Sequence, residues 1–336
     1  MIRAAIVGIG TWGRNLVSSV QRTSERIRFV AGATGTPQKA RQWCEENGVR
    51  LLDSYDALLN DKEVDAVVLA TPHSLHCEQI VAAAKAGKHV FVEKPLGLDA
   101  REAQAAVEAC AEHKVTLAVG YNWRFQPALR AVKQMLDDGT LGKLLHIEGN
   151  FCGPSAYRFA REHWRHDREE VPAGGMTGRG VHVVDAMLFL AGPIGSVSAQ
   201  SDRLVHDYGM DDTTSMLFRF QRGATGYLGT VIATAETWRM QVFGSKGWVE
   251  VGDVEHLHTW DLKTCFMDPA DPTRKLRPEL RHFPKTSTER AELEHFAQAA
   301  AARRPVALPG GDEVHNVAVL GAIVRSSRDG VRVPVA

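Results

Sequence analysis

Three glycines near the start of the chain have the spacing that lets a backbone hold a phosphate. Gly8, Gly10 and Gly13 form a GxGxxG sequence between the first apolar run and the first helical pattern. The first glycine permits a tight turn, the second lets backbone N–H groups approach a pyrophosphate, and the third allows close helix–strand packing. The helix N-terminus that follows adds partial positive charge. The pattern predicts a dinucleotide site that also includes Thr11 and Trp12.

The residues after the second apolar run favour the phosphorylated form of the dinucleotide. An acid about 20 residues beyond the glycines usually grips the adenosine ribose hydroxyls, but no Asp or Glu lies between Glu25 and Glu45. Thr34, Thr36 and Lys39 are found there instead. Thr36 suits the N-cap of the next helix, and hydroxyls, a lysine and a helix N-terminus can hold a 2′-phosphate. NADP is therefore preferred here, and a neutral turn that tolerates NAD is the alternative.

A Glu-Lys-Pro sequence supplies the second motif with chemical potential. Glu93, Lys94 and Pro95 directly follow the apolar run His89–Val92. Open parallel sheets bind ligands at the carboxyl ends of their strands. A lysine at such a position can stabilise a developing alkoxide or share in its proton transfer. The location predicts a catalytic role for Lys94 rather than that of an ordinary surface lysine.

Short apolar runs alternate with helical patterns over residues 1–121, and this alternation positions both motifs. The runs are rich in Val, Ile and Ala without polar alternation, as in strands that are buried on both faces of a parallel sheet. Strand–helix–strand alternation with right-handed crossovers predicts a doubly wound, Rossmann-type α/β domain. The predicted strands are Ala4–Val7, Ile27–Ala33, Val64–Ala70, His89–Val92 and Val115–Val119, and the predicted helices include Pro37–Asn47, Leu75–Ala86 and Ala100–His113.

Residues 122–336 show a different pattern, in which apolar and polar residues alternate along short segments. This predicts a second, α+β domain with a large, mostly antiparallel open sheet and a hairpin turn at Gly244–Gly247. A late helix at Glu289–Ala302 begins with a capping box. The other predicted helices are Pro127–Asp137 and Val181–Leu190, and the predicted strands are Leu144–Phe151, Ser196–Arg203, Thr214–Gln221, Ala224–Ala233, Met240–Phe243 and Trp248–Val251.

Composition and charge exclude several classes of protein. A chain of 336 residues that is 44% hydrophobic and 24% charged is typical of a globular protein of roughly two domains. The 40 basic residues balance the 40 acidic ones, so nucleic acid is not an expected partner. No apolar run approaches the roughly 18 residues of a membrane span, and the strand-like start leaves no room for a signal peptide. Five cysteines without a CxxC pair fit free thiols in the cytoplasm, and no histidine pair has a third ligand for a metal.

The motifs together resemble those of the Gfo/Idh/MocA family, named after glucose–fructose oxidoreductase, inositol dehydrogenase and a rhizopine-catabolism protein. The resemblance covers nearly the full length, and the Glu-Lys-Pro sequence with the later Gly-x-His-x-x-Asp is more specific than the glycine loop. It implies a Rossmann domain and then an α/β domain whose open sheet commonly makes contacts in a homo-oligomer, a dimer or tetramer. The matching segments are Gly8–Gly13, Ala70–His76, Ala86–Pro95, Tyr121–Phe125, Trp164–Arg165 and Gly180–Asp185.

The resemblance also implies roles for single residues of the first domain. It places Thr71, Pro72 and His76 along the dinucleotide. Glu93 and Lys94 would lie near the nicotinamide, with Lys94 at the reacting oxygen.

In the second domain, the resemblance makes His182 the proton-transfer histidine and Asp185 a substrate-facing carboxylate. Residues three apart share a helix face, so the two can line one pocket, and Asp185 is the nearest carboxylate to hold the imidazole. Asn122 and Arg124 fall in a segment that enters the cofactor–substrate cleft of similar proteins. The alternative is that His182 is a packed core histidine with Asp185 as its partner.

Two further features bear on the site. The stretch Arg161–Glu170 is densely charged, which suits either a solvated loop or a lid over the substrate, with Trp164 and Arg165 as its binding residues. Many dehydrogenases of the family carry an Asp four residues before the histidine, and this chain has Gly178 there. A carboxylate at that place would orient the imidazole and raise its basicity.

These observations predict a cytoplasmic oxidoreductase that uses NADP or NAD. It would move hydride to or from a carbinol or carbonyl carbon of a sugar, cyclitol or related polyhydroxy compound, with Lys94 and His182 at the reacting oxygen. Two alternatives stay open. One is a dinucleotide-binding sensor without catalysis, and the other is a redox-neutral enzyme that retains NAD.

Overall fold

Two stretches that are far apart in the sequence share one structural unit. The computed structural model describes residues 1–306 and 312–335. The chain divides into Met1–Asn122 with Ser287–Leu308, and Trp123–Thr286 with Pro309–Ala336. The expectation that everything after residue 121 forms the second domain is thus corrected, because a late helix returns to the first unit. In the described residues, no helix has both the length and the apolar character needed to cross a membrane.

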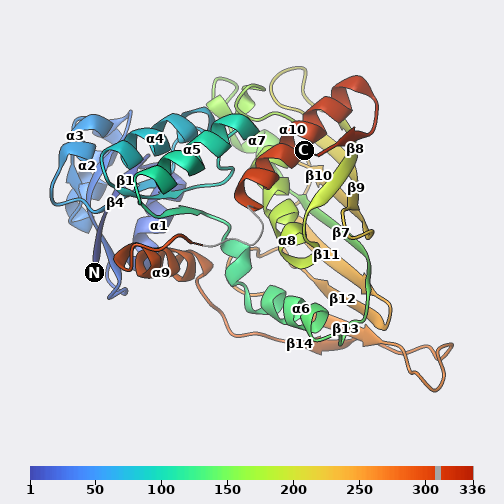
Figure 1. The fold of residues 1–336 in the computed structure, drawn as a ribbon. Helices are drawn as coiled ribbons and strands as arrows, with labels where there is room; N and C mark the ends of the chain where they lie inside the picture. The colour runs from blue at the N-terminus through green and yellow to red at the C-terminus, as the bar shows by residue number, and fades with distance from the viewer. Residues whose placement is uncertain (307–311, 336) are drawn as a thin grey trace. The chain divides into compact units, whose positions relative to one another are not determined.

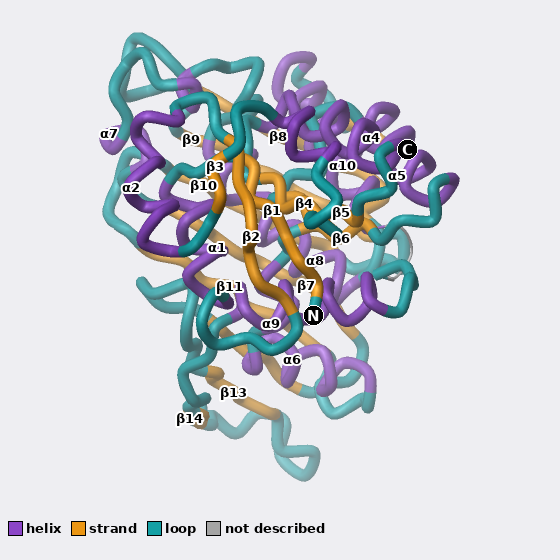
Figure 2. Tube along the Cα trace, turned by 90° about the vertical axis from the view of Figure 1, so that its left-hand side faces the viewer, coloured by secondary structure: helices purple, strands orange, loops and turns teal. Residues whose placement is uncertain are grey.

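A six-stranded sheet organises the first unit, with strand order β3-β2-β1-β4-β5-β6 and parallel pairing throughout. Figure 2 shows β1, β2 and β4 running side by side. The strands are β1 Ile2–Val7, β2 Ile27–Ala33, β3 Arg50–Leu51, β4 Ala66–Leu69, β5 His89–Val92 and β6 Leu117–Val119. The short strand β3 was not predicted, since two residues carry no periodic signal.

Helices cover both faces of this sheet. In Figure 1, α4 and α5 lie side by side on one face, and α1 and α9 lie on the other. The helices of the unit are α1 Thr11–Val20, α2 Pro37–Asn47, α3 Tyr55–Asn60, α4 His76–Lys85, α5 Ala100–Glu112 and α9 Thr288–Ala301, with the 3₁₀ turn η1 at His73–Leu75. This double cover explains why β4 and β5 are fully buried and, apart from His89 at the start of β5, are made of apolar residues.

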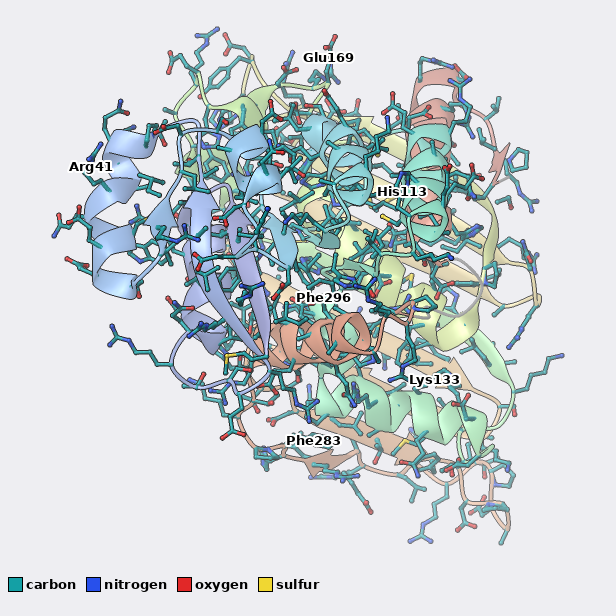
Figure 3. The ribbon with its side chains drawn as sticks, turned by 60° about the vertical axis from the view of Figure 1, so that its left-hand side comes forward. Arg41, His113, Lys133, Glu169, Phe283 and Phe296 are labelled. Atoms are coloured by element: carbon teal, nitrogen blue, oxygen red, sulfur yellow. The ribbon has the colours of Figure 1, made fainter. Side chains whose placement is uncertain are left out.

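Helix α9 joins the first unit because its apolar residues face the sheet. Leu293, Phe296 and Ala297 are buried in one core with residues of β1, β2 and β5. The ring of Phe296 meets Phe91 of β5 edge to face, with centroids 5.8 Å apart, and Figure 3 shows Phe296 on this helix. Ser287 caps α9 by accepting a hydrogen bond from the N–H of Arg290 at 3.2 Å, whereas a capping box that ends at Glu289 would place the N-cap at Thr286.

A nine-stranded sheet forms the second unit, in the order β14-β13-β12-β11-β7-β10-β9-β8-β15. Its strand pairs are antiparallel except for β7 with β10, which run parallel. The predicted hairpin turn joins β11 to β12, with Gly244 opposite Gly247. The strands are β7 Leu144–Cys152, β8 Ile194–Asp202, β9 Thr213–Phe220, β10 Thr225–Val231, β11 Thr237–Gly244, β12 Gly247–Val251, β13 Leu262–Phe266, β14 Glu279–Arg281 and β15 Val333–Pro334.

One face of this sheet is packed and the other is open. Helices α8 and α10 contact each other and the sheet on the packed face. On the open face, Leu217 of β9 and Tyr227 of β10 stand directly opposite each other and are exposed. The helical segments of the unit are η2 Asn122–Phe125, α6 Pro127–Asp137, α7 Ser155–Arg158, η3 Trp164–His166, the π-helical turn η4 Met176–Gly180, α8 Val181–Ala191 and α10 Asp312–Asp329.

Candidate functional site

The glycine loop between β1 and α1 has the geometry that a diphosphate requires. Gly8 has φ +91°, and a side chain there would come within 2.4 Å of the carbonyl oxygen of Ala70. A side chain at Gly13 would collide with the carbonyl oxygen of Gly8 at 2.1 Å. At Gly10, in contrast, an added methyl group would meet none of the described atoms within 4 Å. Helix α1 begins at Thr11 without a side-chain cap, so its first N–H groups suit an anion. The loop therefore fits a dinucleotide.

Arg14 of α1 brings a cationic side chain to the start of α2, a role that the sequence analysis missed. Arg14 of α1 donates from Nη2 to the carbonyl oxygen of Lys39 at 2.8 Å, and its guanidinium lies 5.4 Å from the ring centroid of Trp43. Thr36 is the N-cap of α2, and Thr34 accepts from its N–H at 3.5 Å. The signal for Arg14 was its position directly after the last glycine of the loop. This end of α2 thus combines hydroxyls and cations, and no acid stands in its first turn.

Figure 3 shows the arginine of α2 itself, Arg41, on the outer side of the helix. It is exposed.

His76 connects the loops that follow β4 and β5. Its Nδ1 lies 2.8 Å from the carbonyl oxygen of Pro95, and its Nε2 lies 3.1 Å from that of Thr71. The side chain is 0% exposed. A residue that lines a cofactor needs an accessible surface, so the expectation that His76 contacts the dinucleotide is corrected. Its position at the start of α4 buries the ring between two loop backbones, which makes it a positioning residue.

Thr71 and Pro72 remain partly accessible, as a cofactor-lining role requires. The hydroxyl of Thr71 donates to Oε1 of Gln79 at 2.6 Å. This bond orients the Thr71 side chain from within α4.

Glu93 and Lys94 lie at the carboxyl end of β5, where the Glu-Lys-Pro motif predicted them. Glu93 is only 7% exposed, and burial raises its pKa to about 7. Lys94 and the indole N–H of Trp12 act in the opposite direction, while the nearby carboxylate of Glu289 raises the pKa further. Gly120 allows this packing, because a side chain there would meet Oε1 of Glu93 at 2.9 Å. Lys94 itself is half-buried.

Asn122 ends the first unit as a buried residue. Its Nδ2 donates to Oγ1 of Thr288 at 3.2 Å, which ties the chain to the first residue of α9. Its Oδ1 is buried and has no hydrogen-bond partner in the part of the chain that the structure describes.

His182, on α8 in the second unit, lies against a cluster of aromatic rings. Its imidazole stacks on Trp123 with centroids 5.3 Å apart and an interplanar angle of 20°. Trp123 in turn packs against Trp238 and Trp260, with ring centroids 4.6 Å and 4.9 Å apart. The ring of Phe151 at the end of β7 lies 6.3 Å from the imidazole. These contacts fix the plane of the His182 ring by stacking, whereas the sequence suggested a carboxylate.

Asp185 and Arg124 form an ion pair inside the second unit. The carboxylate of Asp185 is 1% exposed and accepts from Nη2 of Arg124 at 2.6 Å and from its Nε at 2.9 Å. Arg124 also donates to Oδ2 of Asp312 at 2.9 Å, at the start of α10. Burial raises the pKa of Asp185 to about 6, against the opposing effect of Arg124. Both oxygens of Asp185 are thus taken by Arg124.

This arrangement corrects the expected roles of Asp185 and Arg124. Asp185 neither faces a substrate nor holds the imidazole of His182. Arg124 does not face a substrate either, because it binds the carboxylates of Asp185 and Asp312. The physical reason is that α8 is apolar on every side and almost entirely buried. A carboxylate on such a helix needs a cation inside the protein.

A π-helical turn, Met176–Gly180, precedes His182 and contains Gly178, where the resemblance led us to expect an Asp. A methyl group added at Gly178 would meet none of the described atoms within 4 Å. The next residue, Arg179, donates to Oε1 of Glu236 at 2.6 Å, to the carbonyl oxygen of Cys152 at 3.0 Å and to the hydroxyl of Ser155 at 3.0 Å. Its guanidinium also lies 4.7 Å from the ring centroid of Phe151. π-helical turns are frequent at functional sites, and here the turn fixes Arg179 beside the aromatic cluster.

The charged stretch Arg161–Glu170 contains the turn η3. Trp164 and Arg165 stack on each other, with the guanidinium carbon 4.2 Å from the indole centroid. Phe159 lies on the same guanidinium at 5.2 Å. Trp164 and Arg165, the predicted binding pair, are therefore half-buried in an aromatic stack. In a fully solvated loop, both side chains would be exposed.

In the described residues, no group of three or more His, Cys, Asp or Glu side chains could hold a metal ion.

Comparisons with protein-family models place both units in one family. The model described as "Oxidoreductase family, NAD-binding Rossmann fold" matches residues 2–121, and the GFO/IDH/MocA C-terminal domain matches residues 129–250.

Individual proteins show the same likeness. The inositol 2-dehydrogenase of Rhizobium meliloti (strain 1021) is 28% identical over 348 residues, which cover 100% of this chain and 99% of that protein. A 2,7-anhydro-N-acetylneuraminate hydratase of Escherichia coli (strain K12) is 28% identical over 260 residues, or 75% of this chain and 68% of that protein. The solved structure of an aldose-aldose oxidoreductase from Caulobacter crescentus, complexed with glycerol, matches with a TM-score of 0.88 at 25% identity and covers 99% of each chain.

Proposed function

Because the chain belongs to the GFO/IDH/MocA oxidoreductase family, we propose that it transfers hydride to or from a carbinol or carbonyl carbon of a sugar, cyclitol or related polyhydroxy compound. The observation that carries the proposal is the first unit itself. Its glycine loop fits a dinucleotide, and Glu93 and Lys94 lie at the carboxyl end of a strand of the same sheet. When bound, a nicotinamide cofactor would accept or supply the hydride.

Lys94 and His182 act at the reacting oxygen. When an alcohol carbon loses hydride, its hydroxyl must also lose a proton, and Lys94 stabilises the negative charge that develops there. His182 takes up this proton and passes it to solvent. In the reducing direction the same two groups return the proton to the carbonyl oxygen. The stack of His182 on Trp123 supports this role, because it holds the imidazole in one plane.

The carboxylic acid of Glu93 serves the same site. With a pKa near 7, it exchanges its proton in the pH range in which hydride transfer to or from an alcohol is coupled to proton transfer. It lies beside Lys94 at the same strand end, and the charge of Lys94 opposes the burial that raises the pKa of Glu93.

The cofactor is NADP or NAD, and the enzyme binds NADP at least as tightly as NAD. Support comes from the α2 start, where Thr34, Thr36 and the side chains of Lys39 and Arg14 replace the usual ribose-binding acid. A 2′-phosphate at this place meets cations and a helix N-terminus rather than a carboxylate.

A cofactor titration followed by a substrate panel tests the proposed function. The enzyme is mixed with NAD or NADP and with inositols, aldoses, anhydrosugars and their keto forms, and absorbance of the reduced nicotinamide is recorded. Consumption or formation of reduced cofactor with one class of polyhydroxy compound supports the proposal. Tight dinucleotide binding without turnover of any compound would instead favour a sensor.

A redox-neutral reaction with retained NAD is the second candidate. Two observations favour it, namely the glycine at position 178 in place of the family's Asp, and the relative in Escherichia coli that is named as a hydratase. Cofactor that copurifies with the protein, and is present at the same level after complete conversion of a substrate, would support this candidate.

Assembly of several copies is part of the proposal. The exposed pair Leu217 and Tyr227 supports it, because monomeric proteins rarely leave large apolar side chains together on an open sheet. Sedimentation of wild type beside a Leu217→Glu, Tyr227→Glu variant checks for a dimer or tetramer.

A further inference from the structure

We infer that Arg165 binds an anionic group, a carboxylate or a phosphate, on the substrate. The inference rests on the proposed function and adds a charge class to the substrate. The starting observation is that the second unit holds the guanidinium of Arg165 in place without pairing it with a carboxylate in the described residues.

Aromatic rings rather than carboxylates hold the guanidinium of Arg165. Its central carbon lies 4.2 Å from the ring centroid of Trp164 and 5.2 Å from that of Phe159. Within residues 1–306 and 312–335, none of its guanidinium N–H groups donates a hydrogen bond to the protein, and it has no ion-pair partner. Ring contacts fix the plane of a guanidinium and leave its edge N–H groups for bidentate binding of an oxyanion.

Three other arginines of the second unit are paired with carboxylates, whereas Arg165 is not paired in the described residues. Arg158 and Arg179 both bind Glu236, and Arg168 binds Asp211. Burial alone shifts the pKa of Arg165, and it shifts it downward, whereas a nearby carboxylate would raise it. A half-buried cation without an anion is destabilising. A substrate anion would remove this cost.

The side chains next to Arg165 do not neutralise its charge. His163 accepts the backbone N–H of Arg165 at Nδ1, at 3.2 Å, and burial together with Arg165 lowers the pKa of His163. Arg161 lies over the ring of Tyr208 at 4.5 Å. Asp167 accepts the N–H of Glu169 instead of bonding Arg165. Within the described residues, no carboxylate of the stretch therefore occupies the guanidinium of Arg165.

Continuous contacts link this stack to His182 within the second unit. Phe151 lies between the imidazole of His182 and the guanidinium of Arg179. Arg179 bonds Ser155, the first residue of α7. The four-residue helix α7 spans about 6 Å, and Phe159 directly after it lies under Arg165. A substrate that extends from the imidazole along α7 would bring its anionic end to Arg165.

Calorimetric titration of the dinucleotide-loaded enzyme tests the inference. The anionic probes are gluconate, glucuronate and glucose 6-phosphate, and the neutral probes are glucose and myo-inositol. The variants are Arg165→Met, Arg165→Lys and, as a matched loss of charge on an exposed face of the same unit, Arg325→Met. The carboxylate and phosphate probes form separate arms, which distinguish a sugar acid from a sugar phosphate.

We expect at least one anionic probe to bind wild type more tightly than the neutral probes. Arg165→Met should weaken this binding about 30-fold, which corresponds to about 2 kcal/mol, and Arg165→Lys should weaken it less. Arg325→Met should change it less than twofold. If Arg165→Met does not fold, the preference of wild type for the anionic probe should fall steeply between low and high salt.

Three results would overturn the inference: no binding of any anionic probe, equal binding of neutral and anionic probes, or equal losses for both in Arg165→Met. Absorbance of the reduced nicotinamide distinguishes failure of this inference from failure of the proposed function. Binding that depends on Arg165 without turnover of any probe counts against the oxidoreductase and keeps the anion site. Turnover of neutral polyols that the Arg165 variants leave unchanged supports the oxidoreductase and counts against the anion site.

Discussion

The guanidinium of Arg124 holds both carboxylate oxygens of Asp185, at 2.6 Å and 2.9 Å, inside the second unit. Arg124 also reaches Asp312, so one cation joins three elements: the 3₁₀ turn η2, helix α8 and the start of α10. The pair is a fixed internal contact of the helix that carries His182.

Asp185→Asn should therefore destabilise the protein. The amide cannot balance the buried charge of Arg124, and removing one partner of a buried pair costs about 3–5 kcal/mol. Because Asp312 remains, we expect a loss of about 2–4 kcal/mol in the free energy of unfolding, measured in urea. The matched control is Glu169→Gln, an exposed acid labelled in Figure 3. A loss no larger than that of the control would contradict a role for the pair in stability.

Lys94→Ala should lower turnover about 100-fold or more, while the affinity for the dinucleotide changes little. The variant removes the group that assists the charge or proton at the reacting oxygen. Steady-state kinetics with the substrate found by the panel, together with calorimetry of the cofactor, check this. Lys85→Ala, an exposed lysine at the end of α4, is the control. Turnover near the wild-type level would rule out the catalytic role.

Gly178→Asp should move the acidic limb of the pH–rate profile upward. The position has open space for a side chain and no positive φ, and a carboxylate four residues before His182 favours the imidazolium and raises its pKa. Gly178→Ala tests the effect of the side chain without its charge and should leave the limb in place. Equal profiles for both variants would show that position 178 does not act on His182.

Thr34→Asp should shift cofactor preference toward NAD. Wild type should bind NADP at least as tightly as NAD, and a carboxylate at the end of β2 would repel the 2′-phosphate. Calorimetry of both cofactors measures the ratio, and Thr34→Asn is the uncharged control. Wild-type binding of NAD that is tenfold tighter, or about 1.4 kcal/mol, would contradict the prediction.

Glu93 should make the stability of the dinucleotide-free protein depend on pH. Its pKa is raised from 4.5 to about 7 in the folded state, so between these values the folded protein binds more protons than the unfolded chain. The free energy of unfolding should then fall as the pH rises through this window.

Glu93→Gln removes this titration. The variant should be more stable than wild type at pH 8 by about 1–3 kcal/mol, and its stability should change less between pH 4.5 and 7. Urea unfolding at several pH values measures both. Glu112→Gln, an exposed acid on α5, should follow the wild-type curve. A Glu93→Gln curve parallel to wild type would exclude the raised pKa.

Local rules were enough to place the first half of the site. A glycine loop after a strand and a Glu-Lys-Pro sequence after another are read from short stretches of sequence, and both lie where the parallel sheet puts them. Helix α9 shows the limit. Its position and length were predicted to within a residue or two, but its contact with Phe91 joins residues that are far apart in the sequence, and no local pattern encodes it.

Asp185 shows the same limit in the site itself. Its spacing from His182 correctly put both residues on one helix, and a shared face suggested a shared pocket. The helix is buried on every side, however, and Arg124 from a distant turn binds the carboxylate. Arg14 and Arg179 were missed for a related reason, since each is defined by what its guanidinium contacts after folding.

The return of α9 to the first sheet has a consequence for the order in which the molecule is made. A ribosome synthesises β1 to β6 first, yet Leu293 and Phe296 reach their places only after β7 to β14 have emerged. Until then the sheet face that holds Phe91 lacks its cover. The nascent nucleotide-binding unit must therefore wait, with exposed apolar surface, for most of the chain to be translated, and a fragment that ends at Asn122 would be prone to aggregate.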